Sequence, residues 1–175
     1  MLLKSWRKQI FRPECNHSFE SLHCLATLDQ AVGAALPYLN RALGASQYIK
    51  DPPSATFRVH GRLITVHDDH IAINALKDEA QADQILNWLQ REINEAWDNR
   101  EQLDPSHQAA PQPKLIECLK LLPKTNCKKC GQPTCMVFAT LLVQGAMGPE
   151  DCPGLSPDAA EALSGYLSGF ELEVY

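Results

Sequence analysis

Residues 125–135 read TNCKKCGQPTC, and after sixteen further residues Cys152-Pro153 follows. Four of the seven cysteines of the chain, Cys127, Cys130, Cys135 and Cys152, thus fall within 26 residues. Clustered cysteines in a chain without a secretory signal are more often metal ligands or redox groups than disulfides. This stretch therefore decides the C-terminal fold, because the chain around it must bring four thiols to one place.

The spacing of these thiols favours an iron–sulfur cluster. Three thiolates on one loop can hold one face of a cubane, a fourth that arrives after a helix closes the opposite corner, and soft thiolates select iron–sulfur clusters or zinc. Gly131 and Pro133 permit a tight turn, and we expect Cys135 to begin a helix, where free N–H groups favour negative charge. An oxidised cluster with four thiolates has a net charge of about −2. Positive charge beside it comes from Lys124, Lys128 and Lys129.

Two other uses of these cysteines stay open at this point. Structural zinc sites usually pair two Cys-x-x-Cys knuckles, and this chain has one, from Cys127 to Cys130. A thioredoxin-like redox pair needs a surrounding βαβ pattern, which is absent. We therefore favour the cluster over both.

Other groups of possible ligands are better explained as ordinary surface or core residues. Cys118 is interpreted as a small packed hydrophobe. One further candidate metal site consists of His67 and His70 around the turn Asp68-Asp69, and another of Cys15, His17, His23 and Cys24.

The run PKTNC-x-x-CG-x-PTC-x-x-FA at residues 123–139, with Gly145 and Cys152-Pro153-x-Leu155 downstream, resembles a known cluster module. That module occurs in the large (gamma) subunit of the corrinoid/iron–sulfur protein of the acetyl-CoA pathway, and a similar one occurs in the B subunit of the Rnf electron-transport complex. The resemblance covers about residues 114–157 and implies the cluster rather than the parent proteins' full activity. It implies one low-potential 4Fe–4S cluster with four ligands, Cys127, Cys130, Cys135 and Cys152.

Upstream of this module, periodicity predicts an α+β unit. Apolar residues at helical spacing predict a long helix from about Glu79 to Arg100, with Trp97 on its buried stripe, Trp88 off it as a weak interface candidate, and Asp78 with Gln81 as a capping box. Before it, alternating apolar residues predict a three-stranded antiparallel meander with turns at Gly61 and Asp68-Asp69. The alternating residues are Phe57 and Val59, Ile64 and Val66, and Ile71, Ile73 and Ala75.

The remaining pattern completes the domain plan. A helix is expected from about Asp29 to Ala42, begun late or kinked by Pro37 and ended by Gly44, while the first 25 residues look irregular. We predict an α+β domain at 1–104, a polar, proline-bearing linker at 105–113 and a small, mostly helical 4Fe–4S domain at 114–175. Its expected helices are Lys114–Leu122, Cys135–Ala146 ended by Gly148, and one capped by Ser156 before Pro157.

Composition excludes some functions. The net charge is −5, from 16 Lys+Arg against 21 Asp+Glu, which argues against nucleic-acid binding. No stretch approaches the roughly 18–20 apolar residues of a membrane span, and the charged N-terminus is unlike a secretory signal. We expect a cytoplasmic protein.

The leading hypothesis is an electron carrier or redox accessory subunit that exchanges single electrons with a partner redox protein. By the resemblance, that partner can be a corrinoid protein or another enzyme of anaerobic metabolism. The alternative is a regulatory or binding module whose cluster senses redox state or staples the fold. An enzyme is least favoured, because no Gly-rich nucleotide loop or nucleophile–base set is present.

Overall fold

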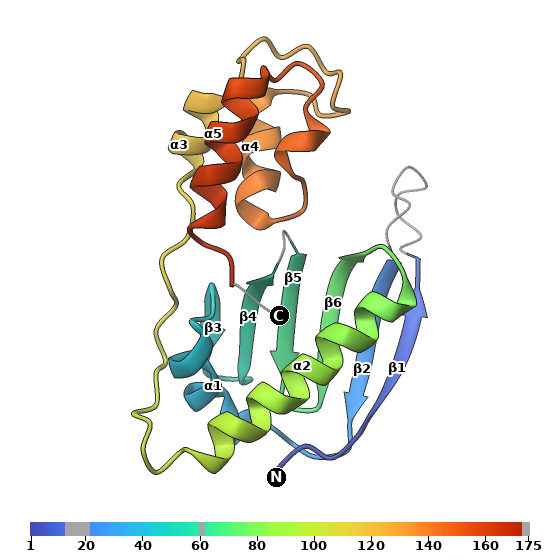
Figure 1. The fold of residues 1–175 in the computed structure, drawn as a ribbon, viewed down its shortest axis with the longest axis vertical. Helices are drawn as coiled ribbons and strands as arrows, with labels where there is room; N and C mark the ends of the chain where they lie inside the picture. The colour runs from blue at the N-terminus through green and yellow to red at the C-terminus, as the bar shows by residue number, and fades with distance from the viewer. Residues whose placement is uncertain (13–21, 60–61, 173–175) are drawn as a thin grey trace. The chain divides into compact units, whose positions relative to one another are not determined.

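The computed structural model describes residues 1–12, 22–59 and 62–172. By their contacts the residues form two compact units, unit 1 with Met1–Phe57 and Arg62–Ala110, and unit 2 with Arg58–Gly61 and Pro111–Tyr175. The fold class is α+β (Figure 1). Within the described residues there are five α-helices, α1 (Leu36–Leu43), α2 (Glu79–Asp98), α3 (Leu115–Leu121), α4 (Cys135–Gln144) and α5 (Pro157–Ser168). The strands of the same residues are β1 (Trp6–Phe11), β2 (Leu22–Leu28), β3 (Gln47–Ile49), β4 (Ser54–Val59), β5 (Arg62–His67) and β6 (His70–Leu76).

The sheet has the strand order β1-β2-β6-β5-β4-β3. The predicted meander corresponds to β4, β5 and β6, and the turn expected at Gly61 lies outside the described residues. Along the core face, Cys24 pairs with Ile73 and Ile73 with Ile64, and all three side chains are buried. Alternating apolar residues therefore formed the strands that the pattern predicted.

The expectation that the first 25 residues are irregular was wrong, because they contain β1 and the start of β2, which pair antiparallel. Their period was hidden by an inward lysine and small core residues. Lys8 is opposite Ala26 in the register, and its ammonium is 2.7 Å from a carboxylate oxygen of Glu79. The aliphatic stem of such a lysine can cover the core while its charge is paired at the rim.

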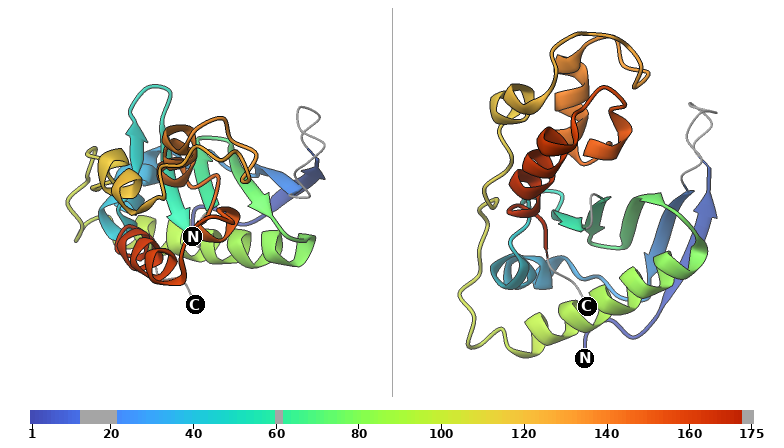
Figure 2. Two further views of the ribbon diagram at one scale, coloured as in Figure 1. Left: turned by 90° about the horizontal axis from the view of Figure 1, so that it is seen from above. Right: turned by 45° about the horizontal axis from the view of Figure 1, so that its top comes forward.

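Helix α2 lies across one face of the sheet (Figures 1 and 2). The Asp78 carboxylate accepts the N–H of Gln81 at 2.8 Å, and the Gln81 side chain accepts the N–H of Lys77 at 3.0 Å, so the predicted cap is present with its second bond shifted by one residue. Trp88 is buried, which contradicts its assignment as an interface candidate, and Trp97 is only half-buried under the Arg100 guanidinium. The buried face of α2 is therefore wider than the stripe of apolar residues that the sequence predicted.

Helix α1 begins at Leu36, after a 3₁₀ turn at Gly33–Ala35, and not at Asp29 as expected. Pro37 occupies its first turn, where a missing N–H costs nothing. Gly44 ends it in the left-handed conformation, with φ 75°. Pro37 and Gly44 thus act as the sequence predicted, and only the start was placed too early.

The first part of the predicted linker is attached to unit 1. The Asn40 side-chain amide donates to the carbonyls of Ser106 at 2.8 Å and Gln108 at 3.0 Å, and the N–H of Ala110 donates to Ala45 at 2.7 Å. The linker at 105–113 stays a prediction, with residues 105–110 bound to unit 1.

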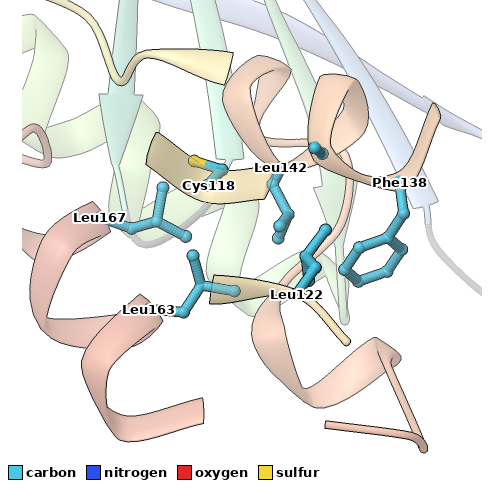
Figure 3. Packing of buried hydrophobic residues seen from close by; sticks show 7 residues of the cluster. Cys118, Leu122, Phe138, Leu142, Leu163 and Leu167 are labelled. Atoms are coloured by element: carbon cyan, nitrogen blue, oxygen red, sulfur yellow. The ribbon is translucent and has the colours of Figure 1, made fainter. Parts of the chain in front are cut away.

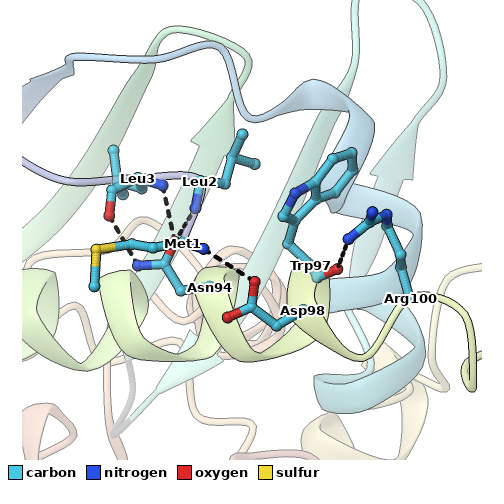
Figure 4. A network of polar contacts seen from close by, with 7 residues as sticks. All are labelled: Met1, Leu2, Leu3, Asn94, Trp97, Asp98 and Arg100. Atoms are coloured by element: carbon cyan, nitrogen blue, oxygen red, sulfur yellow. Dashed lines mark hydrogen bonds and ion pairs between the residues drawn. The ribbon is translucent and has the colours of Figure 1, made fainter.

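Asn94 of α2 anchors the segment that precedes β1 (Figure 4). Its side-chain oxygen accepts the N–H groups of Leu2 at 2.7 Å and Leu3 at 2.8 Å, and its amide donates to the Leu3 carbonyl at 2.8 Å. The Leu3 side chain is fully buried. The Asn94 side chain therefore satisfies backbone groups of Leu2 and Leu3 that a neighbouring strand would otherwise pair with.

No helix within the described residues combines the length and apolar composition that a membrane span requires.

Candidate iron–sulfur site

Helices α3, α4 and α5 of unit 2 pack around a small core (Figure 3). Cys118 of α3 is fully buried in it, which confirms its interpretation as a packed hydrophobe. Cys130, Cys135 and Cys152 are half-buried and pack against this core. The buried members of the core are Cys118, Leu122, Phe138, Ala139, Leu142, Leu163 and Leu167.

Local capping places the helix ends of unit 2. Cys135 is the first residue of α4, as predicted, because the Thr134 hydroxyl accepts the N–H of Val137 at 3.2 Å and caps the helix. The helix ends at Gly145, with φ 73°, and not at Gly148 as expected. Ser156 caps α5 as predicted, with its hydroxyl accepting an N–H at 3.3 Å. The first and fourth cysteines therefore lie in loops, and the third begins a helix.

The loop between α3 and α4 has an unusual backbone. Lys124, Asn126 and Lys128 adopt positive φ angles of 58°, 51° and 60°, and Gly131 has φ 79°. Residues other than glycine and asparagine adopt this backbone conformation at a cost of roughly 1–2 kcal/mol. Left-handed residues that alternate along a chain turn successive N–H groups into an anion-binding concavity of the kind found at iron–sulfur sites. The backbone of this loop is therefore suited to a negatively charged group.

Asn126 ties this loop to the start of α4. Its side-chain oxygen accepts the N–H of Cys135 at 2.8 Å. The loop that contains Cys127 and Cys130 is thereby closed onto the third cysteine. The sequence analysis missed this residue, although asparagine directly before the first cysteine is the residue type that tolerates φ of this sign.

The polar surroundings of Cys127 favour a thiolate. The Lys129 N–H and the Thr125 hydroxyl donate hydrogen bonds to its sulfur and lower the pKa of this exposed thiol. Burial raises the pKa of Cys152, and so do the negative charges of Cys130, Cys135 and Cys127. The pKa of Cys152 thus responds to the charge of each of the other three thiols.

Packing at Gly154 shows how the fourth cysteine arrives. A Cβ built on Gly154 would lie 3.8 Å from the sulfur of Cys127, so the turn after Cys152 lies directly against the first cysteine. The Cys152 carbonyl accepts the N–H of Leu155 at 3.1 Å, which closes this turn. The structure thus places the first cysteine beside the turn that follows the fourth, and the four-cysteine ligand set stays a prediction.

The four thiols do not converge on a point. Among residues 1–12, 22–59 and 62–172, no three His, Cys, Asp or Glu side chains are close enough together to hold a single metal ion. In a cubane each thiolate binds a different iron, so its sulfurs stand farther apart than the ligands of one zinc ion. A donor set of four cysteines, two of them in a loop with left-handed residues, fits a cluster.

The other candidate metal sites gain no support. Cys15 and His17 lie outside the described residues; Cys24 is in the core, and the His23 ring lies 5.8 Å from that of Phe11. The rings of His67 and His70 stack at 4.1 Å with 15° between their planes. Stacked rings direct their nitrogen lone pairs along parallel planes and not at a common point.

Comparison with known proteins identifies this part of the chain. Residues 122–153 match the family model described as "Putative Fe-S cluster". The matched residues include all four cysteines. Over these residues the second unit is therefore similar to the family described as a putative iron–sulfur cluster domain.

Three relatives illustrate the similarity. The gamma subunit of the acetyl-CoA decarbonylase/synthase complex is 43% identical over 53 residues in Methanothermobacter thermautotrophicus, 30% of this chain and 12% of the relative. The same subunit from Methanocaldococcus jannaschii is 53% identical over 47 residues, 25% of this chain and 10% of the relative. The corrinoid/iron–sulfur protein large subunit of Moorella thermoacetica is 48% identical over 48 residues, 27% and 11% of the two chains.

The chain thus spans about a tenth of the length of these relatives. No solved structure matches it.

Proposed function

We propose that this protein binds one 4Fe–4S cluster through Cys127, Cys130, Cys135 and Cys152 and exchanges single electrons with a partner redox protein in the cytoplasm. It is an electron carrier or accessory subunit. A corrinoid protein is the first partner to test, because the relatives include a corrinoid/iron–sulfur protein subunit. The observation that carries the proposal is the packing of Cys130, Cys135 and Cys152 against one small helical core, with the Cys127 sulfur beside the turn at Gly154.

Each of these residues has a definite task. Cys127 and Cys130 present thiolates from the left-handed loop, whose N–H groups face negative charge. Cys135 adds a thiolate at the positive end of α4. Cys152 closes the site from the turn that packs on Cys127. When bound, the cluster supplies a one-electron couple, so the chain takes one electron from a donor and gives one to an acceptor.

The exposure of the first cysteine favours electron exchange over a purely structural role. Cys127 and the neighbouring residues 124–129 are all exposed, so a partner can approach the cluster closely. A staple needs no such access. We therefore rank the redox sensor or structural staple below the electron carrier.

Anaerobic purification tests the cofactor. The holo-protein should contain about four iron and four sulfide per chain and absorb broadly near about 400 nm. Replacing Cys127, Cys130, Cys135 or Cys152 by Ala should abolish or degrade this cluster, while Cys118→Ala, which removes a buried thiol from the same unit, should retain it. Colourless protein with one zinc and no sulfide, after anaerobic reconstitution, would overturn the proposal.

Voltammetry separates the two functions. A carrier should show a reversible one-electron wave at low potential. A cluster that cannot be reduced, or that is destroyed on reduction, would favour the staple.

A further inference from the structure

The charge of this chain is unevenly distributed around the cluster loop. Residues 118–149 contain four lysines and no Asp, Glu or Arg. The rest of the chain has 12 Lys+Arg, which is 16 minus 4, against all 21 Asp+Glu, so its charge is −9. Positive charge is therefore concentrated at the loop of the first three cysteines, while Glu150 and Asp151 directly precede the fourth.

Three of these lysines are free to act on a partner. Lys120 is paired with Glu117 at 2.9 Å. Lys124, Lys128 and Lys129 are exposed, and across the described part of the chain none of the three forms an ion pair. They are held in place by the loop that Asn126 ties to the start of α4.

Exposed apolar side chains lie beside these lysines. Met136 and Val137, which follow Cys135 in the first turn of α4, are 48% and 36% exposed. Because the Asn126 side chain bonds to the N–H of Cys135, the lysine loop and this helical turn adjoin one another. The docking surface, defined as Lys124, Lys128, Lys129, Met136 and Val137, thus combines exposed apolar side chains with positive charge next to the cysteines.

We propose that the docking surface binds an acidic face of a redox protein and so sets which partner exchanges electrons with the cluster. This proposal rests on the electron-transfer function proposed above. Opposite charges speed encounter and orient the partners, and a small apolar contact suffices for a transient redox complex. Nucleic acid fits less well, since three lysines neutralise few phosphates and no aromatic side chain interleaves with them.

The test compares electron transfer to two proteins of opposite charge. Dithionite-reduced holo-protein is mixed in a stopped-flow instrument with an acidic flavodoxin or with basic cytochrome c, and one electron passes from the cluster to the flavin or haem. The second-order rate with flavodoxin should fall about tenfold as ionic strength rises from about 10 to 300 mM, the size expected for electrostatic steering. The rate with cytochrome c should stay level or rise.

A matched pair of variants locates the effect. The triple variant K124Q/K128Q/K129Q should lose about tenfold in the flavodoxin rate at low salt and most of the salt dependence. The control K4Q/K50Q/K77Q removes the same charge from exposed lysines of unit 1 and should react like wild type. Met136→Gln should weaken saturation with flavodoxin while leaving the salt dependence unchanged. An unchanged absorption spectrum verifies that each variant holds its cluster.

Three outcomes would overturn the docking proposal. The first is equal flavodoxin rates for the two triple variants. The second is a rate of transfer to cytochrome c that is higher at low than at high ionic strength. The third is binding of a DNA duplex at about 150 mM salt that the loop variant abolishes, because that would make the surface a nucleic-acid site. A cluster that cycles reversibly on an electrode in these cases leaves the electron-transfer function standing, whereas one that does not cycle refutes that function itself.

Discussion

Replacing Asn126 by Ala should loosen the cluster without removing any thiol. The variant loses the hydrogen bond from the Cys135 N–H, 2.8 Å long, which contributes about 0.5–1.5 kcal/mol. It also puts an alanine at φ 51°, which costs roughly 1–2 kcal/mol because of its Cβ. The central values of the two ranges, about 1 and about 1.5 kcal/mol, should together destabilise the holo form by about 2.5 kcal/mol, roughly a 70-fold change in the equilibrium between closed and open loop.

Iron loss to an excess of chelator under anaerobic conditions measures this opening. Cluster loss from Asn126→Ala should be about 70 times faster than from wild type, if release requires the loop to open. Asn126→Gly loses the bond but accommodates the positive φ, so it should fall between the two, near tenfold. Equal rates for the Gly and Ala variants would refute the backbone part of the reasoning. Wild-type rates for both would refute the hydrogen bond as well.

Three further predictions concern stability. Asn94→Ala should lower the free energy of unfolding by about 2 kcal/mol, because its bonds to the Leu2 and Leu3 backbone are lost. Asn87→Ala on the exposed face of α2 is the control. Equal losses of stability for the two variants in denaturant melts would contradict the role of Asn94 as an anchor. The pKa of His67 is lowered from 6.5 by burial and then by His70. The unfolded chain therefore binds more protons than the folded chain as pH falls through about 6.5, and the free energy of unfolding falls there. His67→Gln should lose less stability between pH 7.5 and 5.5, and an unchanged pH dependence of the free energy of unfolding would count against this. Chelating the iron should remove hydrogen-exchange protection from residues 114–172 while α2 and the meander keep theirs, and uniform loss would indicate one cooperative domain.

The helices and strands with strong local signals could be predicted from the sequence. Helix α2 has its full apolar stripe and its cap within one segment, and β4 to β6 alternate over adjacent residues. The start of α4 at Cys135 and the cap of α5 at Ser156 also rest on neighbouring side chains. The choice of the four cysteines as a set rested on their spacing, their chemistry and the family resemblance, and it stays a prediction. These features depend on residues that are close in the chain, so the sequence by itself determined them.

The rest depended on contacts between distant residues. Strands β1 and β2 have weak alternation, and β2 becomes part of the sheet by pairing with β6, more than 40 residues later. Trp88 is buried because a whole sheet lies under α2, which no local period measures. At the site, the left-handed φ of Lys124 and Lys128 opposes local preference, and the loop is held by the Asn126–Cys135 bond and the turn at Gly154. Tertiary structure decided these features, because their energy comes from partners that the chain brings near only when it folds.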